Sequence, residues 1–243
     1  MKIHFQADIG GPQEAIVVVA DLEGFTQFCN SAIVQQYIAP FLSKVFHELD
    51  VLFNGGKLDW LDETEIVPLP VRPSYCKFLG DGGLFIFFAE EGQPFPVSFA
   101  EKLLARLAAF HTSFPFLKTH VQDTIRDTDL YPNRIRFGIA RGFINRLTRD
   151  DGTGDDIEYI GSSINLASRL QGYCKDLGVI ASTMVGSPPP IYKRLKALNI
   201  RGFDDDTVFV LKDNYTKHQH ETQIVQCFME PDYPDRPDPE DWL

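Results

Sequence analysis

Residues 15–20 have the sequence AIVVVA, an unbroken apolar run in which four of the six residues are β-branched. Such a run is typical of a strand that is buried on both faces of a sheet. With 243 residues and 44% hydrophobic content, the chain is long and apolar enough to build a packed core around this strand. We therefore expect a globular protein with residues 15–20 at the centre of a sheet.

The rest of the chain alternates between helical and strand patterns. In order, we expect a helix from about Gly24 to Asn54, an irregular acidic connection over 57–72, a strand on each side of the GDGG sequence at 80–83, a helix opened by Pro96, a strand over 134–140, a helix over 164–173, and strands over 179–180 and 207–211. This order predicts an α+β protein, a ferredoxin-like α/β sandwich in which helices cover a mainly antiparallel sheet.

The two ends of the chain differ from its body. We expect an N-terminal segment over 1–14, one domain over 15–212, a C-terminal strand or extension over 213–229, and a tail over 230–243. The tail, EPDYPDRPDPEDWL, is acidic and rich in proline, which favours an extended or disordered segment, although Trp242 could dock on the body.

Charge, cysteine spacing and hydropathy argue against several classes of function. The formal net charge is −11, whereas nucleic-acid binding depends on clustered Lys and Arg. The four cysteines lie far apart without a CxxC pair, so neither a zinc site nor a disulfide framework is indicated. No apolar run approaches the roughly 20 residues of a membrane span, and the N-terminus lacks the pattern of a secretory signal. We expect a cytoplasmic protein that binds neither membrane nor nucleic acid.

Asp21 follows an apolar run, and Asp81 interrupts another one. Asp81 lies in the GDGG turn, where it could serve only as a turn residue. Asp21 follows the first strand, where it could cap the next helix. If the two strands are neighbours, however, both carboxylates converge at one edge of the sheet, and such a pair can hold Mg²⁺ against substrate phosphates. The amides of Gly24, Phe25 and Thr26 would then open a helix whose positive end can receive a phosphate.

Asn165 and Arg169 form the third candidate element. They are four residues apart in INLASRLQGY, so on a helix they share one face. An asparagine that orients a sugar and an arginine that neutralises developing charge would suit phosphoryl transfer. A solvated helix face is the alternative.

Taken together, these segments resemble the catalytic domain of the class III nucleotidyl cyclases, the adenylate and guanylate cyclase family. The similar segments are DLEGFT at 21–26, KFLGD at 77–81, FGIARG at 137–142 and GSSINLASRL at 161–170. They occur in the family's order, and the resemblance spans roughly residues 15–212. It implies the class III cyclase fold, with that span as the catalytic domain.

The resemblance also implies roles for individual residues. Asp21, Leu22 and Asp81 would hold two Mg²⁺ or Mn²⁺ ions, which activate the ribose 3′-hydroxyl and clamp the triphosphate while pyrophosphate leaves. Asn165 would position the ribose, and Arg169 would stabilise the transition state.

In this family the site forms between two catalytic domains, with the metal aspartates on one and the Asn/Arg helix on the other. The resemblance therefore implies a head-to-tail homodimer with two equivalent sites. The chain departs from the family at 143–147 and in the loop DDGTGDD at 150–156, so that arm of the dimer is expected to be remodelled. The family's late phosphate-binding lysine has no clear match, and Arg201 could substitute for it.

Lys77 and Glu158 occupy the positions at which the family reads the base. Adenylate cyclases have lysine and aspartate there, whereas guanylate cyclases have glutamate and often cysteine, so guanine is the least expected purine. A lysine donor and a carboxylate acceptor can read adenine, cytosine or uracil. Glutamate reaches about one methylene further than aspartate, and Tyr75 and Phe78 could shorten the pocket, which favours a smaller ring.

We expect neither a sensor domain nor a membrane segment beside the cyclase body, and on this expectation the chain resembles the stand-alone pyrimidine cyclases of bacterial Pycsar anti-phage systems. This resemblance implies a cyclic UMP or cyclic CMP messenger that acts on a separate effector protein, with UTP favoured as substrate. The alternatives are an adenylate cyclase that makes cyclic AMP, a catalytically silent nucleotide-binding or dimerisation module, and another phosphoryl-transfer enzyme such as a polymerase-like domain.

Overall fold

In the computed structural model, β2 (Gln13–Glu23) lies at the centre of a mixed sheet. The structure describes residues 5–7, 11–58, 60–61, 64–125, 129–149, 157–173, 175–204 and 206–230. The strands follow the order β12 (Phe228–Met229), β10 (Tyr192–Ala197), β11 (Asp206–Leu211), β9 (Val179–Ser182), β7 (Arg134–Arg149), β2, β6 (Gly82–Phe88) and β5 (Tyr75–Phe78). Among the described strand pairs only β7 and β9 run parallel. The predicted mainly antiparallel α+β fold is confirmed.

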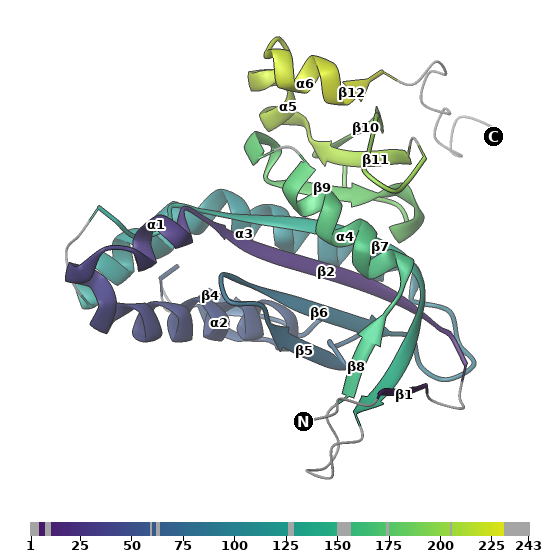
Figure 1. Cartoon of the computed structure of the whole chain (residues 1–243), viewed down its shortest axis with the longest axis horizontal. Helices are drawn as coiled ribbons and strands as arrows, with labels where there is room; N and C mark the ends of the chain where they lie inside the picture. Colours follow the sequence, from purple (N-terminus) through teal and green to yellow (C-terminus); the bar gives the residue numbers. More distant parts are fainter. Residues whose placement is uncertain are drawn as a thin grey trace.

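Helices cover both faces of the sheet, which is why the β2 run is apolar throughout (Figure 1). Ile16, Val18 and Ala20 join the large core that also contains residues of α2 (Ile38–Asn54) and α3 (Val97–Thr124). Ala15, Val17 and Val19 point the other way, into a smaller cluster that includes Ala167 of α4 (Ser162–Tyr173). Alternate residues of one strand therefore fill two separate cores.

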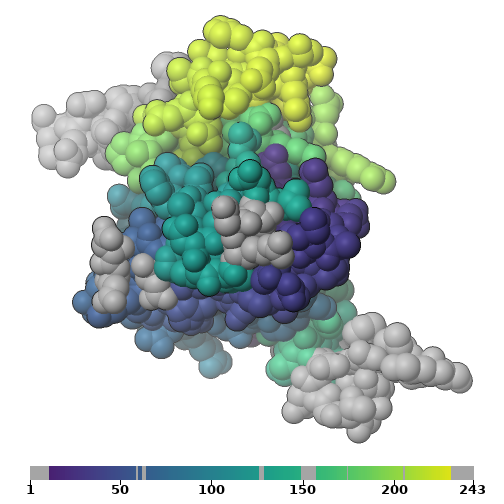
Figure 2. Space-filling model, turned by 90° about the vertical axis from the view of Figure 1, so that its left-hand side faces the viewer, coloured from purple at the N-terminus to yellow at the C-terminus, as the bar shows by residue number. Residues whose placement is uncertain are grey.

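The C-terminal elements form a further layer at one end of the sheet. α5 (Lys212–His218) and α6 (Thr222–Cys227) pack with β10 and β11 around a third cluster, which also takes in Leu170 of α4. Figure 2 shows these elements in yellow above the rest of the molecule. The prediction of a strand or extension over 213–229 omitted both helices.

The long helix expected from Gly24 to Asn54 is divided in the structure. α1 (Phe25–Cys29) and the 3₁₀ helix η1 (Ala32–Tyr37) precede α2, and Ser31 between them is extended. Pro40 explains the late start of α2, because a proline lacks the amide that a helix interior requires and is tolerated only in the first turn. The connection over 57–72 is not wholly irregular, since β3 (Gly56–Leu58) pairs with β4 (Thr64–Ile66).

β7 is longer than the predicted strand and continues beyond the sheet as an arm (Figure 1). β8 (Ile157–Ile160) and β1 (Phe5–Ala7) pair with its far half. At the near half, Gly138 allows α4 to lie against the strand, because a Cβ on Gly138 would stand 1.9 Å from the carbonyl oxygen of Ala167. Gly138, the first glycine of the FGIARG segment, thus fixes the position of α4 on the sheet.

A partly buried histidine joins α3 to the C-terminal layer. His111 Nδ1 lies 2.7 Å from the carbonyl oxygen of Ile135, and the side-chain amide nitrogen of Asn214 lies 3.3 Å from Nε2. Because an amide nitrogen can only donate, Nε2 accepts and Nδ1 carries the proton. Burial lowers the pKa of His111 below its usual 6.5.

We expect the stability of the protein to fall as the pH drops below about 6.5, because protonation of His111 favours the unfolded chain. The loss should reach up to about 1.4 kcal/mol per pH unit from this residue. Urea unfolding at pH 8 and pH 5.5 measures it. His111→Asn keeps a donor for Ile135 but cannot titrate, so its pH dependence should be weaker than that of the parent; equal dependence would contradict the assignment.

Several predicted features lie outside the described residues, namely Cys174, the loop over 150–156 and the tail over 231–243 with Trp242. None of the described helices combines the length and apolarity that crossing a membrane requires.

Candidate functional site

The two predicted metal carboxylates come from neighbouring parts of the sheet, Asp21 from β2 and Asp81 from the turn between β5 and β6. Asp21 is paired with Gly82 across β2 and β6, and the amide of Leu22 donates to the carbonyl oxygen of Asp81 at 2.9 Å. Since the N–H and C=O of a residue in an antiparallel strand face the same neighbour, the Leu22 carbonyl also points towards Asp81. Both aspartates and this carbonyl therefore meet at one edge of the sheet. Asp21 lies within β2 and does not cap α1, whose N-cap is Gly24.

Arg136 is a residue of this edge that the sequence interpretation missed. It lies opposite Asp21 across β2 and β7, and its guanidinium forms an ion pair with the Asp21 carboxylate. The Arg136 side chain is only 10% exposed. Its Nε and Nη1 are buried and have no hydrogen-bond partner within the described part of the chain. A buried cation with two unused donors thus stands beside the predicted metal site.

The segment after β2 turns directly into α1. Gly24 has a φ of 84°, in the left-handed region, and its carbonyl accepts from Phe28. The side chain of Phe25 is buried in the large core, so only its backbone is available to a ligand, next to that of Thr26. At the end of α1, burial and then the charge of Asp81 raise the pKa of the Cys29 thiol, which places α1 within the field of that carboxylate.

The two predicted base-reading residues are in contact. Lys77 of β5 forms an ion pair with Oε1 of Glu158 of β8, and the hydroxyl of Tyr75 lies 3.4 Å from Oε2 of the same carboxylate. Lys77 and Glu158 are 39% and 33% exposed, so the pair is open to a ligand. Phe78 does not belong to this group. It packs against Phe46 of α2, with ring centroids 5.3 Å apart, on the opposite face of β5.

Asn165 and Arg169 lie on the outer side of α4. Both are exposed, whereas Ser163, Ala167 and Leu170 of the same helix are buried against the sheet. Within the described residues no hydrogen bond or ion pair joins Asn165 or Arg169 to the edge that carries Asp21 and Asp81. One chain thus presents these two groups separately. Arg201 is exposed in the turn between β10 and β11, and among the residues that the structure describes no contact places it near either group.

Comparisons with known proteins were made by sequence and by structure. No family model and no curated protein matches the sequence. By structure, the chain is similar to the adenylyl cyclase CyaB from P. aeruginosa, with a TM-score of 0.58 and 16% identity over 87% of this chain and 96% of that chain. It is also similar to the guanylyl cyclase Cya2, with a TM-score of 0.60 and 16% identity over 83% and 93% of the two chains. The catalytic core of a rhodopsin-guanylyl cyclase with converted specificity, in complex with ATPαS, gives a TM-score of 0.52 and 18% identity over 86% and 97%.

The chain has the class III nucleotidyl cyclase fold. Within this cyclase fold, the edge formed by β2 and the β5–β6 turn supplies a donor set of two carboxylates and one carbonyl. These are the hard oxygen ligands that Mg²⁺ and Mn²⁺ prefer. The described residues contain no group of three or more His, Cys, Asp or Glu side chains that could hold a metal by themselves. The ion pair with Arg136 involves Oδ2 of Asp21, and the carboxylate has a second oxygen, so the residues fit a metal whose remaining ligands come from a substrate.

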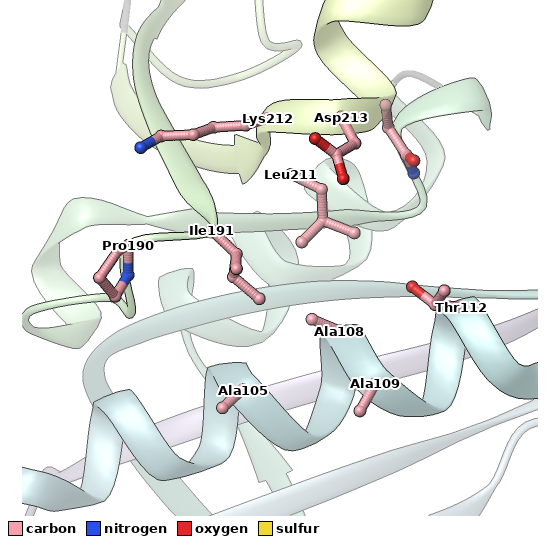
Figure 3. Close-up of a pocket in the computed structure, with 10 residues that line it drawn as sticks. Ala105, Ala108, Ala109, Thr112, Pro190, Ile191, Leu211, Lys212 and Asp213 are labelled. Atoms are coloured by element: carbon pink, nitrogen blue, oxygen red, sulfur yellow. The ribbon is translucent and has the colours of Figure 1, made fainter.

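A cavity of about 620 Å³ lies elsewhere in the cyclase fold, between α3 and the start of α5 (Figure 3). Ala105, Ala108 and Thr112 of α3 face residues 190–191 and 211–214 across it. Since α3 packs on the opposite face of the sheet from α4, this cavity contains none of the predicted site residues.

Proposed function

We propose that this protein is a nucleotidyl cyclase that converts a pyrimidine nucleoside triphosphate to its 3′,5′-cyclic monophosphate and pyrophosphate, with UTP favoured and CTP possible. One observation carries the proposal: Asp21 of β2 lies beside the turn that holds Asp81, while Asn165 and Arg169 share the exposed side of α4. In this proposal the aspartates supply the metal-binding half of a phosphoryl-transfer site, and Asn165 and Arg169 supply the half that binds the substrate. A cyclase fold would use both halves together.

In the proposed reaction, the ribose 3′-hydroxyl gives its proton to solvent water, and its oxygen bonds to the α-phosphorus. The bond from that phosphorus to the bridging oxygen of the β-phosphate breaks, and pyrophosphate leaves. Asp21, Asp81 and the carbonyl of Leu22 would hold two Mg²⁺ or Mn²⁺ ions. When bound, such ions lower the pKa of the attacking hydroxyl and neutralise phosphate charge.

The other residues of the site would bind and orient the substrate. Asn165 would hydrogen-bond to the ribose, and Arg169 would neutralise the charge that develops on the transferred phosphoryl group. The unused donors of buried Arg136 suit a phosphate oxygen at the metal edge. Backbone amides of Gly24, Phe25 and Thr26 are further candidates for phosphate contacts, and Arg201 is the proposed substitute for the late lysine.

The contact between Lys77 and Glu158 supports their proposed role as base-reading residues. Lys77 would donate to O4 of uracil, and Glu158 would accept from N3–H. Because residue 158 is glutamate rather than aspartate, its carboxylate reaches about one methylene further towards the base, which favours a single-ring base. Guanine is the least suitable purine in this proposal, because the family's guanylate cyclases have glutamate where this chain has Lys77.

We further propose that the active form is a head-to-tail homodimer. Asn165 and Arg169 are exposed, and within the described part of the chain no hydrogen bond or ion pair joins them to the metal edge, which supports a site that a second chain completes. The arm formed by β7 and β8 exposes Phe143 and Ile160, which are 62% and 51% exposed and would be covered in a dimer.

The wider role that we propose is a cytoplasmic second-messenger enzyme of anti-phage defence, whose cyclic nucleotide acts on a separate effector protein. The sequence resemblance to stand-alone pyrimidine cyclases supports this extension.

Two other functions would use the same fold. An adenylate cyclase would read adenine through the same Lys77 and Glu158, and a silent module would bind nucleotide without turnover. The presence of both aspartates together with Asn165 and Arg169 favours an active enzyme, because nucleotide binding alone does not require all four.

The deciding experiment is incubation of the purified protein with equal concentrations of UTP, CTP, ATP and GTP plus Mn²⁺, followed by separation of the products. We expect cyclic UMP to predominate. Predominant cyclic CMP would correct the base only, predominant cyclic AMP would replace the pyrimidine proposal by adenylate cyclase, and no cyclic product from any triphosphate would overturn the enzyme proposal.

A further inference from the structure

Tyr75 lies directly beside the Lys77–Glu158 pair. Tyr75 and Lys77 are paired across the strands with Ile86 and Leu84, whose side chains belong to the cluster on the α4 side of the sheet. Both residues therefore point to that side, and Cys76 between them points to the other. Glu158 uses one carboxylate oxygen for Lys77 and the other for the Tyr75 hydroxyl. Both oxygens of the Glu158 carboxylate therefore contact side chains of β5.

The ring of Tyr75 is itself held in place. It packs edge-on against Tyr159, with centroids 5.0 Å apart and an interplanar angle of 71°. The ring of Tyr159 in turn packs against that of Phe88, with centroids 5.5 Å apart. All three rings pack against the cluster of β2, β6 and α4. Because aromatic pairs have preferred geometries, Tyr75 is a fixed support rather than a mobile side chain.

We propose that Tyr75 determines the size of the base that the site accepts. It holds the Glu158 carboxylate close to the base and prevents that carboxylate from moving further away. The inference rests on the proposed function, in which Lys77 and Glu158 read the base. With the ribose fixed, the reading edge of a purine lies further from the sugar than that of a pyrimidine, so a purine needs a more distant carboxylate. The Tyr75 hydroxyl contacts that carboxylate, and the Tyr75 ring is held against the cluster of β2, β6 and α4.

Two substitutions separate the hydroxyl from the ring. Tyr75→Phe keeps the ring and removes the hydrogen bond to Glu158, so the pyrimidine preference should remain while KM for the preferred triphosphate rises about three- to tenfold. Tyr75→Ala removes the support, so the purine-to-pyrimidine ratio of kcat/KM should rise about tenfold or more. Cys76→Ala is the matched control on the same strand, and both its activity and its ratio should equal those of the parent protein.

Equilibrium binding keeps this test separate from that of the proposed function. In an Arg169→Ala background, which should bind nucleotide without turnover, competition between UTP and ATP gives an affinity ratio that needs no activity. A ratio that shifts towards ATP in Tyr75→Ala but not in Tyr75→Phe or Cys76→Ala supports the inference. An unchanged ratio in Tyr75→Ala overturns it, as would failure of the Arg169→Ala protein to bind either nucleotide. Absence of cyclic product from the parent protein would overturn only the enzyme proposal.

Discussion

Replacement of Asp81 by alanine should abolish turnover while leaving the fold as stable as before. If Asp81 and Asp21 hold the two ions, its loss removes several kcal/mol of transition-state stabilisation, which corresponds to a decrease in kcat of about a thousandfold or more. Asp81 lies in the β5–β6 turn and forms no ion pair among the described residues, so the free energy of unfolding should change little. Cyclic-nucleotide production and urea unfolding measure the two effects.

Asp21→Ala, unlike Asp81→Ala, should lower the stability of the protein as well as abolish turnover. Two unpaired carboxylates would repel each other, and on that basis loss of either would leave stability unchanged or raised. The structure makes this expectation wrong for Asp21, because its partner Arg136 is 10% exposed and would be left buried without a counter-charge. We expect a loss of about 3 kcal/mol in addition to the loss of turnover.

An exposed carboxylate of α3 provides the control for both variants. Glu101→Ala should change neither activity nor stability. Normal turnover in Asp21→Ala or Asp81→Ala would rule out the two-metal assignment, and an unchanged stability of Asp21→Ala would show that the Arg136 pair contributes little.

The features that sequence patterns predicted correctly are those encoded locally. The AIVVVA run required burial on both faces and is the central strand. The four-residue spacing of Asn165 and Arg169 put them on one side of a helix, which α4 confirms. The expectation that the Asp21 strand and the strand after GDGG are neighbours is also confirmed, although this pairing joins distant segments.

The features that were missed depend on pairings between distant residues. Arg136 contacts Asp21 across 115 positions of the chain, and only the β2–β7 register brings them together. The wrong placement of Phe78 had a local signal, because consecutive residues of a strand face opposite ways and Lys77 and Phe78 cannot both line one pocket. The division of the first long helix was likewise signalled by Pro40, whose ring and missing amide are incompatible with a helix interior.

Mixing two inactive variants tests the shared site most directly. In a heterodimer of Asp81→Ala and Arg169→Ala chains, one site combines both defects and the other has every group intact, provided that the two halves come from different chains. Random exchange makes half of the dimers mixed, so activity should return to about one quarter of the parent level. The product assay after co-incubation, with exchange shown by co-purification of differently tagged chains, measures this recovery.

The matched control is a mixture of Asp21→Ala and Asp81→Ala. Both residues lie at the same edge of one chain, so each site of their heterodimer lacks one carboxylate and activity should stay absent. Recovery in the first mixture and not in the second would be explained only by a site divided between the metal edge of one chain and α4 of the other. If neither mixture recovers although exchange is demonstrated, the exposed Asn165 and Arg169 do not complete a partner's site, and the head-to-tail dimer has to be abandoned.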